Sequence, residues 1–207
     1  AVAGDLYASA TDRQTQVRLY DGSGNQTASA VFDPSPAGQL NYPISIEADA
    51  DGDLYVLGTY TAGTFRSYLM KVTGSLDPDW DRDLTGSAQT DGDVFAYGFS
   101  VHPDGRSLVV GSRPAGTPKG WVGLFDGGGT LVEQTTILDE YETSTLYDAA
   151  WTDDGGFIVA GATDEGTGWR SLLRRYDSDF NVVWTDDGPM NDSFALSVDT
   201  DDFGSFV

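Results

Sequence analysis

Three ten-residue stretches of this 207-residue chain align with one another without gaps. They are DGDLYVLGTY at 51–60, DGRSLVVGSR at 104–113 and DGGFIVAGAT at 154–163. Related stretches are AGDLYASATD at 3–12 and DFGSFV at 202–207. The period is about 50 residues, the length of a supersecondary unit that buries its apolar residues by stacking on its neighbours. A repeat architecture therefore constrains this fold more than any other feature of the sequence.

Each repeat carries four short β-type segments, rich in β-branched and aromatic residues and bounded by Gly, Asp, Asn or Ser. We expect strands at 44–48, 54–60, 67–73 and 80–84, at 95–101, 107–112, 121–126 and 131–137, and at 146–152, 157–163, 171–177 and 181–186. No stretch shows a sustained 3.6-residue apolar period, so no helix longer than a turn is predicted. The short turns carry Asp, Asn and Gly, which tolerate the positive φ values of tight hairpins.

Four-stranded units at this period predict an all-β fold, a single β-propeller domain over 1–207 with blades of four antiparallel strands. The repeat units span about 3–43, 44–93, 94–144 and 145–192. The first has strands at 6–11, 15–21 and 26–32 and lacks a first strand, which 193–199 could supply. We therefore expect 193–202 to complete the first blade and close a four-bladed ring, hiding both free edges. The alternative is an open fragment of a six- to eight-bladed propeller.

The charge of the chain restricts its partners. Asp and Glu total 33 against 11 Lys and Arg, a net charge of −22, and the acids are spread along the whole chain. Nucleic acid is excluded as a partner because phosphate binding needs a basic stripe. No apolar run reaches the ~18–20 residues that span a bilayer, so no membrane span is predicted in this segment.

Two interpretations of the acidic surface remain open. High salt shortens the screening length to ~3 Å at 1 M and removes self-repulsion, and the abundance of Asp beside two lysines resembles the surfaces of halophilic archaeal proteins. The other interpretation is a calcium-rich extracellular protein.

Catalytic chemistry has few candidates in this sequence. The chain has no cysteine and a single histidine, His102, before Pro-Asp-Gly in a predicted turn. A zinc site or a Ser-His-Asp triad would depend entirely on that residue. We therefore assign no catalytic residue.

The fourth unit, DDGGFIVAGATDEGTGWRSLLRRYDSDFNVVWT, resembles the β-propeller repeats of secreted bacterial and archaeal surface proteins, and GSLDPDW at 74–80 is similar to the end of the related delta-60-type repeats. The resemblance covers nearly the whole chain. It departs from the family pattern at Phe180, where the turn between the third and fourth strands usually has Gly. What the resemblance implies is an extracellular or cell-surface propeller used for binding or display.

Three cations occupy one aligned position of the repeat: Arg66, Lys119 and Arg170. Repetition would bring them to the same end of three blades, where they could bind a carboxylate, a sulfate or an acidic glycan. The alternative is that each pairs with an acid of its own blade.

A possible calcium site is the turn that contains Asp49, Asp51 and Asp53, because hard oxygen ligands at alternating positions suit Ca²⁺. The motif lacks the downstream bidentate Glu of a helix-flanked calcium loop. Asp in a hairpin turn is the alternative explanation. No other cofactor is predicted.

Aromatic residues cluster at or just before the expected first strands: Tyr42, Phe95, Tyr97, Tyr147 and Phe194. Their rings could stack on a sugar while Asp91, Asp93, Asp148 and Asp192 bond its hydroxyls. Trp169, in a loop beside Arg170, is a further candidate. Packing between blades is the alternative role for these rings.

Taken together, the sequence predicts an exported, non-catalytic binding or surface-display module. Its ligand would be anionic or a carbohydrate, or its partner another surface protein. The alternatives are a polysaccharide hydrolase or lyase that uses two carboxylates at the channel mouth, and a self-assembling component of the cell envelope.

Overall fold

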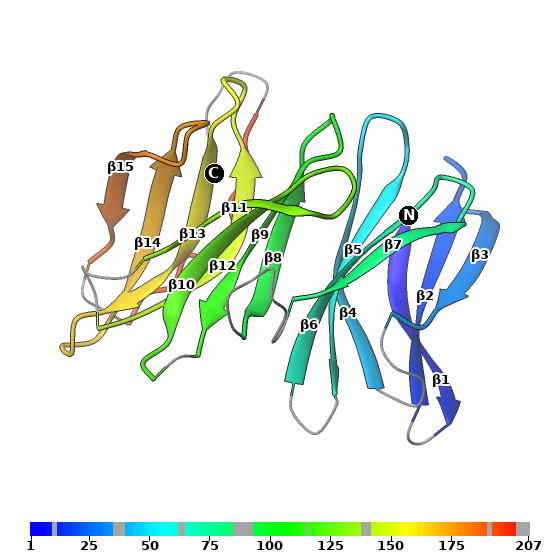
Figure 1. Cartoon of the computed structure of the whole chain (residues 1–207), viewed down its shortest axis with the longest axis horizontal. Helices are drawn as coiled ribbons and strands as arrows, with labels where there is room; N and C mark the ends of the chain where they lie inside the picture. Colours follow the sequence, from blue (N-terminus) through cyan, green and yellow to red (C-terminus); the bar gives the residue numbers. More distant parts are fainter. Residues whose placement is uncertain are drawn as a thin grey trace. The chain divides into compact units, whose positions relative to one another are not determined.

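A computed structural model describes residues 1–9, 12–34, 40–61, 65–84, 93–114, 116–137, 142–189 and 192–201 (Figure 1). Every regular element within these ranges is a β-strand, which confirms the all-β prediction. The same ranges contain no helix with the length and hydropathy needed to cross a bilayer.

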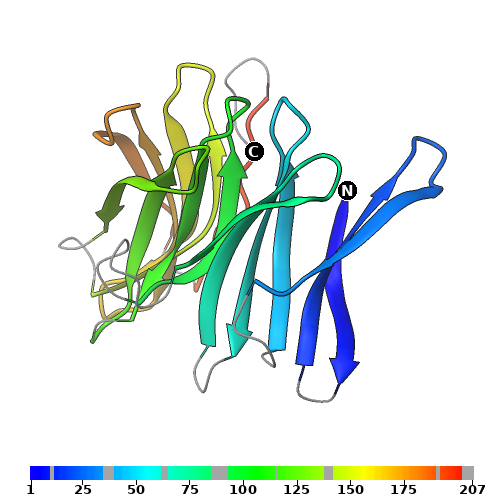
Figure 2. The same cartoon turned by 45° about the vertical axis from the view of Figure 1, so that its right-hand side comes forward.

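The N-terminal strands form two antiparallel meanders, each in sequence order. The first consists of β1 (Val2–Ser9), β2 (Asp12–Tyr20) and β3 (Gln26–Phe32). The second consists of β4 (Leu40–Ala48), β5 (Leu54–Thr61), β6 (Phe65–Val72) and β7 (Pro78–Asp83). A single parallel pair, Arg13 with Leu40, joins β2 to β4 and links the meanders into one seven-stranded sheet (Figure 2).

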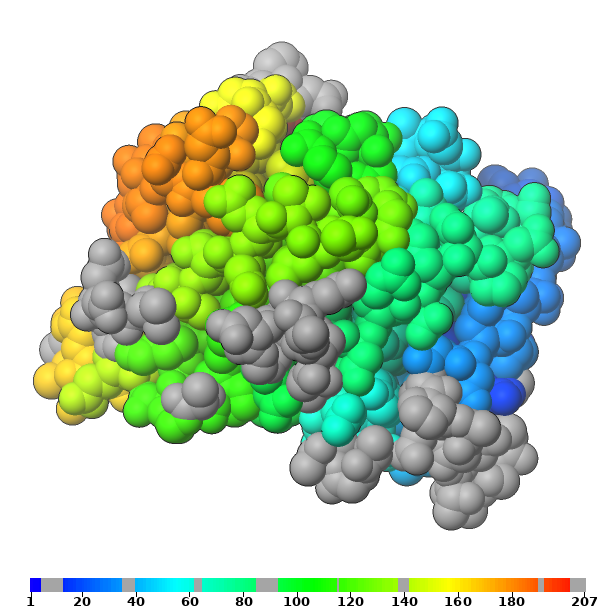
Figure 3. Space-filling view, in the orientation of Figure 1, coloured from blue at the N-terminus to red at the C-terminus, as the bar shows by residue number. Residues whose placement is uncertain are grey.

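Two further meanders have four strands each, again in sequence order. One contains β8 (Phe95–Val101), β9 (Ser107–Arg113), β10 (Lys119–Phe125) and β11 (Leu131–Thr136). The other contains β12 (Thr143–Trp151), β13 (Phe157–Asp164), β14 (Trp169–Tyr176) and β15 (Val182–Asp187). Strand β11, the last of its meander, lies at the surface in Figure 3. Every strand expected from the repeat up to residue 186 is present, most of them within three residues of the predicted ends.

The chain divides into two compact units, each with an apolar core. Unit 1 comprises Ala1–Phe95, Val101–Arg106 and Asp126–Thr130, and unit 2 the remainder. The core of unit 1 joins its two meanders through Val17, Leu54, Val56, Tyr68 and Met70. The core of unit 2 brings β9, β10, β12, β13 and β14 together through residues that include Leu108, Val122, Leu146, Val159 and Leu172. Large apolar side chains at alternating strand positions thus hold neighbouring meanders face to face.

One hairpin backbone recurs in seven turns of the described ranges. In each, the first residue accepts a backbone hydrogen bond from the fourth and donates one to the fifth, and the fourth has positive φ. This is a type I turn followed by a one-residue bulge. In four of the turns the first residue is Asp21, Asp49, Asp126 or Asp177, and its carboxylate accepts the N–H groups of the third and fifth residues. Part of the high Asp content is therefore structural.

The sequence predicted a strand at 193–199, whereas the structure has none there. The segment packs on β12 and β13 of unit 2, where Ala195 donates its N–H to the Gly161 carbonyl over 3.1 Å. Val198 is buried in a cluster with Ala150, Ile158 and Ala160, and Ala195 packs against this cluster partly buried. The apolar face of this meander is the physical reason, since covering it removes apolar side chains from water. Among the described pairings, β1 is bonded only to β2, so they include no closure of the first blade.

Candidate functional site

The aromatic residues that the sequence analysis singled out in unit 2 form two ring pairs. Tyr97 on β8 and Tyr147 on β12 have ring centroids 5.9 Å apart. Tyr147 occupies a bulge in the pairing of β12 with β13, between Leu146 and Asp148. Gly98 approaches the Tyr147 carbonyl so closely that no Cβ would fit. Strands β8 and β12 therefore meet backbone to backbone here, and the Tyr97 ring remains 41% exposed.

The second pair joins the start of β14 to the C-terminal segment. Trp169 and Phe194 have ring centroids 5.7 Å apart at an interplanar angle of 31°. The Asp192 carboxylate accepts the Trp169 N–H over 3.3 Å, which fixes the start of the segment. Phe194 remains 45% exposed and Leu196, two residues further on, is 67% exposed.

The segment 192–201 connects the two ring pairs. Its Ser197 hydroxyl and Val198 N–H donate to one oxygen of Asp148, over 2.8 and 3.0 Å, directly after Tyr147. The Thr200 hydroxyl donates to the Trp151 carbonyl over 2.7 Å. A shallow hollow beside these bonds is lined by Ser197, Asp199, Thr200 and Asp201. One exposed ring, two hydroxyls and two carboxylates thus follow one another along this segment, at Phe194, Ser197, Asp199, Thr200 and Asp201.

The chemistry of this surface suits a polyhydroxylated ligand. Exposed aromatic faces stack on the C–H faces of sugar rings, and carboxylate and hydroxyl groups bond the sugar hydroxyls. Burial, reinforced by the neighbouring Tyr97, raises the pKa of the Tyr147 hydroxyl, which therefore stays protonated at neutral pH and can donate a hydrogen bond. Of the residues expected to assist, Asp148 and Asp192 lie here, whereas Asp91 is outside the described residues.

Two of the three cations at the aligned repeat position have acidic partners in their own meanders. Arg66 forms an ion pair with Asp83 at 3.2 Å, and Asp83 also accepts the Tyr60 hydroxyl at 2.9 Å. Arg170 forms one with Glu165 at 3.3 Å. Lys119 begins β10, where it pairs across the ladder with Arg113. Arg66 belongs to unit 1, and Lys119 and Arg170 belong to unit 2.

The turn that contains Asp49, Asp51 and Asp53 already holds a cation, the Lys71 ammonium. Its nitrogen lies 2.9 Å from Asp53 and 3.6 Å from Asp49. Burial alone would lower the pKa of Lys71, but the hydrogen bond to Asp53 and the contact with Tyr55 raise it overall. The hydrogen bond from Lys71 in turn lowers the pKa of Asp53. Asp51 offers only its backbone N–H to this network.

No group of three His, Asp or Glu side chains within the described ranges has the geometry of a metal site. In the acidic turn, Lys71 supplies the positive charge that two carboxylates require. The partner was hard to find in the sequence because Lys71 lies on β6, 18 residues after Asp53. Only the pairing of β5 with β6 brings them together.

Sequence reasoning missed the position of 192–201 and a groove in unit 1. For the position of 192–201, the available signal was the spacing of Ala195 and Val198. They are three residues apart, whereas a strand places every second residue on the same face. The groove lies between β3 and the β6–β7 hairpin, strands that the repeat pattern places in different meanders.

No protein-family model matches the sequence, and no curated protein sequence matches it either. Prolyl oligopeptidase B from Galerina marginata, bound to a 25mer macrocyclization substrate, superposes over 95% of this chain with a TM-score of 0.43 and 11% identity. A candidate glycoside hydrolase from Parabacteroides distasonis superposes over 95% of this chain and 77% of its own, with a TM-score of 0.42 and 13% identity. The chain spans about a quarter, 26%, of the length of the prolyl oligopeptidase B chains. These superpositions are too loose to assign a function.

Proposed function

We propose that this chain is an exported, non-catalytic carbohydrate-binding module, and that its four meanders are blades of a β-propeller. The observation that carries the proposal is the stretch of exposed rings and hydrogen-bonding groups on unit 2, from Tyr97 and Tyr147 to Trp169 and Phe194. Tyr97 and Phe194 are exposed and their partners Tyr147 and Trp169 are partly buried, so each pair offers a ring on which a sugar can stack. Its acidic setting favours neutral or amino sugars over anionic glycans, because like charges repel.

Binding to soluble polysaccharides tests the proposal. The purified chain should be titrated calorimetrically with neutral glucans, galactans and chitin oligomers, together with polyuronates as the anionic comparison. Tyr97→Ala and Phe194→Ala should each weaken binding by about tenfold, which corresponds to ~1.4 kcal/mol and is a reasonable loss for one stacked ring. Val132→Ala is the matched control, because Val132 is an exposed apolar side chain on β11 of the same unit.

Three results would redirect the proposal. Release of reducing ends from a bound glycan would favour the hydrolase or lyase alternative. Tighter binding of polyuronates, lost in Lys119→Met, would favour an anion site at the repeat cations. Self-association that buries well over ~1,000 Å² and is abolished by Phe194→Ala would favour an envelope component.

The closed four-bladed form has a test of its own. A compact domain of this length has a radius of gyration of about 17 Å, which small-angle scattering measures directly. A clearly larger value for a monomer would contradict the closed ring and favour an open array of blades.

A further inference from the structure

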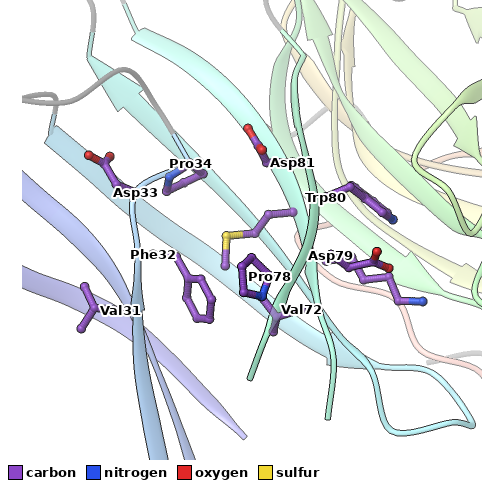
Figure 4. Close-up of a pocket in the computed structure, with 11 residues that line it drawn as sticks. Val31, Phe32, Asp33, Pro34, Val72, Pro78, Asp79, Trp80 and Asp81 are labelled. Atoms are coloured by element: carbon purple, nitrogen blue, oxygen red, sulfur yellow. The ribbon is translucent and has the colours of Figure 1, made fainter. Parts of the chain in front are cut away.

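Unit 1 contains a groove of about 330 Å³ between β3 and the β6–β7 hairpin (Figure 4). Strands β3 and β7 are the outer strands of their meanders, since β3 pairs with β2 and β7 with β6. The core of unit 1 holds the two meanders together at Val17 and Tyr68, while the described pairings leave these outer strands unpaired with each other. The volume is at the lower end of the range for small-molecule sites.

The floor and walls of the groove are largely apolar. Phe32 and Pro34 line one side and Pro78 lines the other (Figure 4). Met70 also lines the groove and belongs to the buried core of unit 1. Phe32 packs against the same cluster that contains Met70, so the floor consists of side chains that already contact one another. A ligand would find preformed hydrophobic contact here and would not have to order a loop.

The rim of the groove is acidic. Asp81 is exposed and pairs with Met70 across the β6–β7 ladder, so its carboxylate lies on the face that Met70 shares. A bulge in this pairing interrupts the alternation at Asp79, whose exposed side chain lies beside Trp80 on the other side of β7 (Figure 4). Neither carboxylate has a hydrogen bond or an ion pair within the described residues. Asp33 adds a third carboxylate across the groove, where it accepts the Asn41 side-chain N–H at 2.9 Å.

Two cations, Lys71 among the lining residues and Arg82 beside them, are bonded to other groups. The Lys71 ammonium is bonded to Asp53 and lies near Asp49. The Arg82 guanidinium donates to the carbonyls of Gly128 and Gly129 at 2.8 and 2.9 Å. The groove therefore keeps a negative rim over an apolar floor, and the charge of −22 on the whole chain adds to its attraction for cations.

We propose that this groove binds a small organic cation, an ammonium or guanidinium group carried on a short apolar body. The charged head lies between Asp81 and Asp33, and the body lies against Phe32, Met70 and Pro78. Carboxylates on either side of a cation supply charge-assisted hydrogen bonds, and the apolar floor selects against small hydrated ions such as Na⁺. This site is in unit 1 and does not depend on carbohydrate binding at unit 2.

A matched pair of probes tests the proposal at low salt. Phenethylamine and 2-phenylethanol have nearly the same shape and differ in charge, and ethylamine keeps the charge but lacks the ring. Binding can be followed by calorimetry, with the change in tryptophan fluorescence as a second measurement, because Trp80 is among the residues at the groove. We expect phenethylamine to bind at least tenfold more tightly than either 2-phenylethanol or ethylamine.

The substitution Asp81→Asn should weaken phenethylamine binding by at least tenfold. Asp51→Asn is the control, because it removes one exposed charge elsewhere and should leave the affinity within a factor of two. Equal binding of 2-phenylethanol, or equal loss in both variants, would overturn the proposal. So would binding of a basic peptide without binding of the free amine, which would assign the groove to a protein partner.

Discussion

At the scale of single residues, the structure explains side chains that the repeat pattern leaves ambiguous. Lys71 is one of two lysines in the chain, and it neutralises a turn that resembles a calcium loop in sequence. Asp49 holds that turn by accepting backbone N–H groups, and Asp53 accepts the ammonium. The spacing of acids alone could not distinguish these roles, because a metal and a lysine require the same carboxylates.

Replacing Lys71 by Met should destabilise the protein by about 2 kcal/mol, because two partly buried carboxylates lose their counter-charge. The folded-state pKa of Asp53 is depressed by Lys71, so its contribution is present above the unfolded pKa and is lost as the pH falls through the folded value. Chemical denaturation between pH 7 and pH 3 should therefore show a shallower acid loss in the variant than in the wild type. Asp51→Asn should behave as wild type, and an unchanged acid slope in Lys71→Met would disprove this role.

Phe180 has φ of +62°, and its ring packs on Phe157 with centroids 4.9 Å apart. Gly24 and Gly129 occupy the equivalent turn position in the first and third units. Phe180→Ala should lose the ring contact and keep the strained backbone, whereas Phe180→Gly loses the contact and relieves the strain. We expect Gly to be the milder substitution by about 1 kcal/mol, the reverse of the usual order. Thermal melting of both variants decides the point.

At the scale of elements, the repeat and its turn residues were sufficient to predict the strands up to residue 186 and their antiparallel order. The prediction was possible because the turns between strands contain residues that favour one hairpin backbone. Gly52, Gly105 and Gly155, for example, have φ of 81–87° in these turns. The strand predicted at 193–199 is absent. Its sequence pattern is that of a strand, but Ala195 and Val198 pack on a face of β12 and β13 that exists only after folding. The sequence identified the aromatic residues as candidates, but it could not show which rings contact each other.

Gly98 tests the close approach of β8 to β12. A Cβ at this position would meet the Tyr147 carbonyl, a backbone group that cannot rotate away. Gly98→Ala should therefore cost about 2–3 kcal/mol and reduce glycan binding, because it displaces Tyr147. Gly22→Ala is the control, since a Cβ added there would have nothing within 4 Å, and the substitution should be close to neutral. Equal melting temperatures for the two variants would mean that the strands do not meet as described.

At the scale of the whole molecule, the charge of −22 dominates behaviour in solution. Many of the acids lie exposed at the surface, so their mutual repulsion opposes the folded state at low salt. The screening length falls from ~10 Å at 0.1 M to ~3 Å at 1 M ionic strength, so added salt weakens this repulsion. No pairwise contact predicts this effect, which only the sum of the charges shows.

The melting temperature should rise as KCl increases from 0.1 M to 2 M. A variant with Asp51, Asp153, Asp179 and Asp186 all changed to Asn should melt higher at 0.1 M and respond less to salt, because these four side chains are exposed and do not hold turns. A melting temperature that stays flat or falls with KCl would remove the high-salt interpretation of the composition.

The position of 192–201 has a consequence for how copies of this chain meet. The face of β12 and β13 that bears Ala150, Ile158 and Ala160 is apolar. If it were uncovered, a second copy could pack on it and a third copy on the second, which is how open filaments grow. Ala195 and Val198 occupy that surface from within the same chain. The segment thus blocks the addition of further copies at this face. Deleting residues 192–201 should make the protein polymerise through the exposed face, which light scattering would detect.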